Sequence, residues 1–455
     1  MDNKDNFLGT APVGKLLLKL TIPSVAAQLI NMLYNIVDRI YIGHIPGDGV
    51  QALTGVGVCL PLIMIVSAFA MLISMGGAPR ASIFMGKGDN ESAEKTLGSC
   101  FLTQIIISAV LTAVLLIWNR ALLLTFGASE NTIDYAASYM QIYAIGTIFV
   151  PLTLGMSAFV TAQGFTRVSM LTVLAGAVAN IILDPIFIFA LGLGVRGAAA
   201  ATIISQSISA ILSISFLISK KAVMRLKAEN IRFAPKVVLP CLALGLAPFI
   251  MQSSESVISV CFNSSLLKYG GDIAVGAMTI LTSVMQFALL PVQGFCQGAQ
   301  PILSYNFGAG SSDRVKKTFR LMLTTSLIYT TVLWAFVMLF PAKFAGIFSP
   351  DAELVEFTAG ALRIYCAVLF IFGIQLACQM AFISFGNAKS SIIVAVMRKF
   401  ILLLPLIYIM PRIMENKTMG VYAAEPAADI IAVTFTACLF AVQFKKAMKG
   451  IDNKK

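Results

Sequence analysis

Apolar residues fill most of the chain in long runs that are separated by short polar breaks. A helix rises about 1.5 Å per residue, so a run of about 20 apolar residues crosses the ~30 Å hydrocarbon core of a bilayer. Runs of this length predict twelve transmembrane helices, near residues 17–42, 52–78, 97–118, 133–159, 168–192, 197–218, 239–267, 274–300, 320–341, 355–384, 388–411 and 419–444. The sequence therefore predicts an all-α polytopic membrane protein.

A set of glycine, proline and polar positions recurs at one constant spacing in the two halves of the chain. The pairs are Gly76 with Gly298, Pro79 with Pro301, Ser82 with Ser304, Gly86 with Gly308, Gly88 with Gly310, Lys95 with Lys317 and Thr96 with Thr318. Six spans per half is an even number, so the second half begins on the same side of the membrane and the two repeats are parallel. We expect an N-terminal six-helix lobe at 1–218, a basic cytoplasmic linker at 219–238 and a C-terminal six-helix lobe with a short basic tail at 239–455. Substrate is expected to pass between the lobes.

The positive charges predict the orientation. The stretch before Lys15 has no apolar segment with a cleavage site, so the first span is expected to be retained and the N-terminus to stay in the cytoplasm. With alternating loops from there, most of the 33 Lys and Arg are cytoplasmic, as the positive-inside rule requires. This accounts for the net charge of +12 without a nucleic-acid partner. We expect a monomer in the cell membrane, with the bilayer as its partner and both termini cytoplasmic.

Several kinds of chemistry have no support in the sequence. The eight cysteines lack CxxC spacing, and the single histidine, His44, lies at the end of the first span, where a solvated position is expected. The loops at 85–88 and 307–310 contain paired glycines but not GxxxxGK[ST], so they predict tight turns rather than ATP binding. No prosthetic cofactor is expected.

An intramembrane enzyme is also disfavoured. The spacing of Asn180 and Asp184 matches half of a prenyltransferase metal motif, but position 188 is Ile and no second aspartate-rich motif follows. HExxH and GxSxG are absent as well. We therefore predict that the protein is not an enzyme.

Acidic residues at membrane depth are the first candidates for function, because an ionisable side chain in hydrocarbon costs several kcal/mol. The sequence places five there: Asp38, Asp184, Glu255, Glu425 and Asp429. Asp38 ends a stripe that begins with Gln28, Asn31 and Asn35, whose spacing puts all four on one helix face. This face is expected to look into the protein rather than toward lipid.

A second polar group is predicted at a similar depth. Asn180 and Asp184 share a face of the fifth span, Pro185 leaves the carbonyl of Ile181 without its backbone donor, and Thr202 lies near the outer end of the sixth span. Together with Asp38, these oxygen-bearing side chains suit a small cation such as Na⁺, and two facing carboxyls can also take up a proton. The alternative is that they only satisfy one another as interhelical hydrogen bonds.

The seventh span carries the corresponding stripe of the second half, made of Gln252, Glu255 or Ser256, Ser259 and Asn263. Glu255 is a candidate for binding a cationic substrate or a second proton, with a structural role left open. Glu425 and Asp429 share a face near the start of the last span, where we expect partial solvation.

The segments from Ala162 to Gly164, from Asn180 to Pro185 and from Gly192 to Ala199, with the paired motifs of the second and eighth spans, resemble the multidrug and toxic compound extrusion (MATE) family. The resemblance covers about Leu16 to Phe444 and is greatest to the prokaryotic branch of DinF-type and MepA-type exporters.

The resemblance implies two lobes around a central cavity, and export of organic cations or amphiphilic drugs, with resistance to antibiotics, by antiport with Na⁺ or H⁺. It also implies a cation site at Asp38, Asn180, Asp184 and Thr202. The NorM-like branch uses in addition a Glu of the seventh span, for which Glu255 is the candidate, and an Asp of the tenth, where this chain has Gln375. The competing hypothesis is a flippase for a lipid-linked precursor; such proteins usually have a cationic cavity, whereas here acids were predicted at depth.

Overall fold

The computed structural model describes residues 7–47 and 49–453, and in these ranges the regular structure is entirely helical. The N-terminal half contains α1 (Phe7–Thr10), α2 (Val13–Gly43), α3 (Gly49–Gly86), α4 (Asn90–Ile117), α5 (Asn119–Thr125), α6 (Ile133–Ile145), α7 (Phe149–Ala162), α8 (Thr166–Pro185), the π-helix η1 (Ile186–Ala190) and α9 (Val195–Ile218).

The C-terminal half begins after a connecting segment that holds the short η2 (Ala228–Asn230). It contains α10 (Pro235–Gly308), α11 (Ser312–Leu339), α12 (Pro341–Gly346), α13 (Ala352–Tyr365), η3 (Leu369–Ile371), α14 (Phe372–Ser384), α15 (Ala388–Val396), the π-helix η4 (Met397–Leu403), α16 (Leu404–Ile413) and α17 (Lys417–Asp452).

The predicted number of membrane spans is confirmed once three breaks are taken into account. In the described residues nine helical stretches are long and apolar enough to cross a membrane, and two bent pairs, α6 with α7 and α13 with α14, bring the number to eleven. Helix α10 has 74 residues, far more than one crossing needs, and Gly271 interrupts it with φ 66° and ψ −161°. A side chain is strained at that φ, so glycine allows the turn there. Helix α10 thus holds two spans, and the total is twelve.

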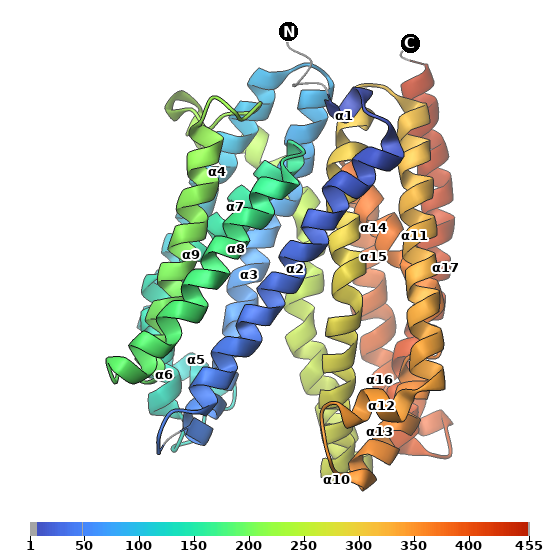
Figure 1. Ribbon diagram of the computed structural model, residues 1–455. Helices are drawn as coiled ribbons and strands as arrows, with labels where there is room; N and C mark the ends of the chain where they lie inside the picture. The colour runs from blue at the N-terminus through green and yellow to red at the C-terminus, as the bar shows by residue number, and fades with distance from the viewer. Residues whose placement is uncertain (1–6, 48, 454–455) are drawn as a thin grey trace.

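The two halves form two bundles that lie side by side (Figure 1). Helix α1 and the C-terminal end of α17 lie at the same end of the molecule, which we call the terminal end (upper end in Figure 1). The predicted turns are found there, because α3 ends at Gly86 and α10 at Gly308, and Gly88 and Gly310 follow with φ 78° and 72°.

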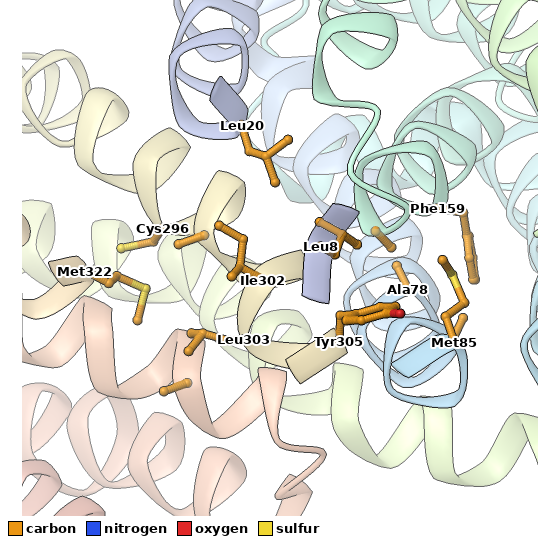
Figure 2. Packing of buried hydrophobic residues seen from close by; sticks show 14 of the residues in the cluster. Leu8, Leu20, Ala78, Met85, Phe159, Cys296, Ile302, Leu303, Tyr305 and Met322 are labelled. Carbon is orange, nitrogen blue, oxygen red and sulfur yellow. The ribbon is translucent and has the colours of Figure 1, made fainter. Parts of the chain in front are cut away.

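The largest buried cluster joins the two bundles at the terminal end. It combines Leu20 and Phe159 of the N-terminal half with Ile302 and Met322 of the C-terminal half (Figure 2). Leu8 of α1 lies between them and is 2% exposed. Two further clusters, one built around Tyr139 and Met140 and the other around Phe262 and Tyr422, each stay within a single half. The halves therefore share a core at the terminal end and have separate cores elsewhere.

The repeated glycines form the contact between the halves. An added Cβ at Gly76 or Gly86 of α3 would overlap backbone atoms of α10, and one at Gly298 or Gly308 of α10 would overlap backbone atoms of α2 or α3. Small residues allow membrane helices to approach closely enough for their backbones to touch. The repeat found in the sequence is thus, in large part, the contact surface between the two halves.

The eight cysteines act mainly as packing residues, as expected. All of them are free thiols, six are buried, Cys261 is half-buried and Cys438 is exposed. His44 is exposed at the end of α2, as predicted, and its Nδ1 lies 2.7 Å from the carbonyl oxygen of Ile40.

The close contact at Gly76 leads to a prediction. In Gly76→Ala the new methyl group would push against the carbonyl of Cys241, and overpacking of this kind costs about 1–3 kcal/mol. We expect an apparent Tm several degrees below that of the wild type in detergent, measured by size-exclusion chromatography after heating. Gly57→Ala, on the same helix with open space around it, is the control and should melt like the wild type. Equal melting of the two variants would contradict the close approach.

Candidate functional site

Three of the predicted site residues are brought together inside the N-terminal half. Asp38 comes from α2, and Asn180 and Asp184 come from α8; they are 9%, 1% and 0% exposed. The Nδ2 of Asn180 donates a hydrogen bond to Oδ1 of Asp184 over 3.1 Å. The carboxyl groups of Asp38 and Asp184 lie close enough to interact with each other.

The local fold of α8 explains how Asn180 and Asp184 reach the site. Residues four apart lie on one face of an α-helix, so both side chains leave α8 toward α2. Pro185 cannot donate a backbone hydrogen bond, and the chain continues in the wider turns of η1. Such π-helical turns are frequent at functional sites.

Several oxygens of this group accept no hydrogen bond from the described part of the chain. They are Oδ1 of Asp38, Oδ2 of Asp184 and Oδ1 of Asn180. A buried acceptor without a donor loses hydration and gains nothing in return, so it favours a proton or a cation as its partner. Oxygen atoms are the ligands that hard cations prefer. The group fits Na⁺ or H⁺, and it provides none of the nitrogen or sulfur ligands of a zinc site.

Thr202 lies beside this group rather than in its centre. Thr202 is half-buried on α9, and its hydroxyl interacts with Tyr139 of α6. Tyr139 is 3% exposed and lies within electrostatic range of Asp38. Tyr34 also lies near Asp38, and its hydroxyl accepts a hydrogen bond from Nε2 of Gln206 over 3.2 Å. Reasoning from acidic residues missed these neutral neighbours, because a tyrosine carries no charge that marks it in an apolar span.

The polar stripe on α2 runs from the contact between the halves toward this site. Nε2 of Gln28 donates to Oε1 of Gln297 on α10 over 2.8 Å. Asn31 is half-buried and Asn35 is exposed, with its Nδ2 donating to the carbonyl of Asn31 over 2.6 Å. The two asparagines thus retain polar atoms that a substrate can reach.

The C-terminal half differs from the prediction for Glu425 and Asp429. Both acids are buried, with 8% and 7% of their surface exposed, so the expectation of partial solvation was wrong. The reason is Arg398 of η4, which donates from Nη2 to Glu425 over 2.8 Å and from Nε to Asp429 over 2.7 Å. Its guanidinium also lies over the ring of Phe372, 4.7 Å from the centroid. The buried arginine thus gives each of the two carboxylates an ion-pair partner.

Glu255 is likewise paired with a base. Nζ of Lys399 lies 2.6 Å from Oε1 of Glu255, and the two side chains are 5% and 50% exposed. The sequence analysis considered only the acids at membrane depth and missed the two bases, Arg398 and Lys399, that pair with them. Adjacent Arg398 and Lys399 inside a predicted span were the available signal. Gln252 and Ser256, on the same part of α10 as Glu255, are half-buried.

The comparisons with known proteins identify the family. A model of the MatE family matches residues 23–186 and 247–409, one match in each half. The chain belongs to the MatE family. Its members are membrane transporters rather than enzymes. The resemblance inferred from the sequence is thereby confirmed.

Similar MATE proteins cover nearly the whole chain. This chain is 23% identical over 409 residues to "Multidrug export protein MepA" of Staphylococcus saprophyticus. It is 24% identical over 409 residues to the protein of the same name from Staphylococcus aureus, and each match covers 90% of both chains. Among solved structures, "Crystal structure of MATE in the bent conformation" has a TM-score of 0.92 at 20% identity, covering 99% of this chain and 100% of that one. "Outward-facing conformation of a multidrug resistance MATE family transporter of the MOP superfamily" has a TM-score of 0.91 at 20% identity, covering 98% and 99%.

The buried arginine leads to a prediction. In Arg398→Met, Glu425 and Asp429 lose their counter-charge, and breaking a buried ion pair typically costs about 3–5 kcal/mol. We expect a strongly lowered apparent Tm. The triple variant Arg398→Met, Glu425→Gln, Asp429→Asn removes all three charges and should recover most of the loss. If Arg398→Met alone melts like the wild type, Arg398 does not compensate these acids.

Proposed function

We propose that this protein is a secondary antiporter that exports organic cations or other amphiphilic drugs in exchange for Na⁺ or H⁺. The observation that carries the proposal is the buried pair Asp38 and Asp184, which has no basic partner among the hydrogen bonds and ion pairs of the described residues. Buried carboxylates without a base gain a counter-charge only when they bind a proton or a cation. The export activity in the names of the two staphylococcal relatives agrees with the proposed direction.

The proposed coupling uses the two lobes as moving units. The lobes are residues 1–218 and 239–455, joined by a linker at 219–238. An ion at Asp38 and Asp184 favours one arrangement of the N-terminal lobe, and a substrate in the cleft between the lobes favours the other. A ligand shifts such an equilibrium only by its difference in affinity for the two states, so exchange requires that ion and substrate prefer different states.

The shared core at the terminal end supplies the two arrangements. In the structure this core is closed, and toward the other end each lobe has a core of its own. We propose that a cleft between the lobes opens toward that other end. We propose that the terminal end faces the cytoplasm, so the observed arrangement is outward-facing. Substrates then contact Asn31 and Asn35 on one wall, and Gln252, Glu255 and Ser256 on the other.

The segment between the halves stays attached to the N-terminal lobe in this proposal. Nζ of Lys227 lies 2.6 Å from Oε2 of Glu94, and the backbone amide of Arg225 donates to Oε1 of the same carboxylate over 3.3 Å. Glu94 raises the pKa of Lys227, so the ammonium remains charged at neutral pH. These contacts hold the linker against α4 while the C-terminal lobe moves.

The flippase hypothesis receives less support. A lipid-linked precursor with phosphate groups needs a surplus of positive charge in the cleft. Here Arg398 is matched by two carboxylates and Lys399 by one, so the buried bases produce no such surplus.

The decisive test is efflux of a fluorescent organic cation from proteoliposomes under an imposed Na⁺ or pH gradient. We expect the wild type to respond to one of the two gradients and Asp184→Asn to lose most of that response, because the ion site then has a single carboxylate. Asp134→Asn, which removes an exposed carboxylate bound only to Arg120 at 2.8 Å, is the matched control and should transport normally.

Transport under neither gradient, with correctly inserted protein, would contradict the antiporter. Equal gradient-driven transport by Asp184→Asn and the wild type would contradict the role of the carboxylate pair.

A further inference from the structure

The ion pair of Glu255 and Lys399 lies where α10 faces the N-terminal lobe. Residues 241, 245, 248, 252 and 255 follow one another at spacings of three and four, so they share a face of the helix. Nearer the terminal end this face contacts α3, because a Cβ at Gly245 would overlap the backbone of Leu72, and the rings of Phe249 and Phe69 are 5.0 Å apart nearby. Glu255 continues the same face beyond the contact and is 50% exposed, so it lies on the side of α10 that faces the N-terminal lobe, where the proposed function places the cleft.

The pair has unused hydrogen-bonding capacity on both sides. An ammonium group carries three donors, and Lys399 uses one of them on Oε1 of Glu255. Its side chain is 5% exposed, so water reaches little of the rest. Oε2 of Glu255 has no donor among the described residues. An acceptor and a set of donors therefore lie next to each other at one place in the cleft.

Arg398, the neighbouring base, differs in this respect. Two carboxylates and an aromatic ring hold its guanidinium, and it lies deeper in the lobe with 8% of its side chain exposed. Lys399 has one carboxylate, and this carboxylate is also the group that a substrate meets first. Arg398 is thus held in place by its partners, whereas a ligand can compete with Lys399 for Glu255.

A compact permanent cation binds poorly at such a pair. At Oε2 of Glu255 it meets a carboxylate whose charge Lys399 already compensates, and it comes close to that ammonium, so like-charge repulsion adds a cost. A ligand that also carries an anionic group avoids this cost, because the anion offers Lys399 a replacement partner while the cationic group contacts Glu255. Charge-assisted hydrogen bonds of this kind are about twice as strong as neutral ones.

We propose that Glu255 and Lys399 form a dipolar subsite that selects zwitterionic substrates over permanent cations of the same shape. The inference rests on the proposed function, since it defines which substrates the exporter takes. Lys399 acts as a tethered competitor for Glu255 and sets the specificity of the C-terminal wall of the cleft.

The test measures binding of two dyes that differ in one charge, a rhodamine with a free carboxylic acid and the ethyl ester of the same rhodamine. Fluorescence polarisation on purified protein in nanodiscs gives the two Kd values. We expect the wild type to bind the free acid about tenfold more tightly than the ester, the equivalent of one good ionic contact. Lys399→Met should reverse the preference, because Glu255 is then free to pair with the cationic ester and no ammonium receives the acid.

Two further variants make the result specific. Lys399→Arg keeps the positive charge and should retain the preference for the free acid. Lys389→Met removes an exposed lysine at the start of α15 and should behave like the wild type. Where Lys399→Met expresses poorly, Glu255→Gln with Lys399→Met removes both charges and should bind the two dyes equally.

An unchanged preference in Lys399→Met, or equal affinities in the wild type, would overturn the subsite. Because the readout is binding, this failure is distinct from failure of the proposed function, which appears as the absence of gradient-driven transport.

Discussion

Close backbone contact between two lobes at one end of the molecule is the constraint on which the rest of the structure depends. Glycines repeated in both halves allow α2 and α3 to touch α10, and a single apolar core seals the terminal end around them. Toward the other end each lobe has its own core, so the lobes separate there without losing stability. A seal at one end together with independent cores at the other is the physical requirement for a transporter that opens to alternate sides of the membrane.

The two lobes treat buried charge in opposite ways. In the N-terminal lobe Asp38 and Asp184 lie together without an ion pair among the described residues, and some of their oxygens have no donor there. In the C-terminal lobe each of Glu425, Asp429 and Glu255 is paired with a base, Arg398 or Lys399. Membrane helices tolerate charges only when these are paired or functional. The pair without a base is therefore the place that we propose for a coupling ion, and the paired network stabilises the C-terminal lobe.

Most of the fold could be predicted from the sequence because hydrophobic length is a strong constraint in a bilayer. The apolar runs located the spans, and the repeat indicated two parallel halves. Only the structure shows that the repeated glycines form the contact between the lobes. The depth of Asp38 and Asp184 and the helical spacing of Asn180 indicated the polar group in the first lobe. Contacts between distant helices were beyond this reasoning. Arg398 and Lys399 lie inside a run that is apolar on average, so the hydropathy of the run does not reveal them. Only the packing of η4 against α17 and α10 shows which acids they pair with.

Cross-linking of the lobes at the terminal end tests the central claim most directly. The buried thiols of Cys100 on α4 and Cys241 on α10 lie close enough to interact across the boundary between the halves. In a variant that keeps only these two cysteines, copper phenanthroline oxidises the pair to a disulfide. The yield of the disulfide is measured by cleavage at a protease site introduced into the linker, because the disulfide alone then joins the two fragments. The account predicts that transport in proteoliposomes falls in proportion to the yield and returns with dithiothreitol. Normal transport by fully cross-linked protein would show that the lobes do not separate at this end, and would contradict the account.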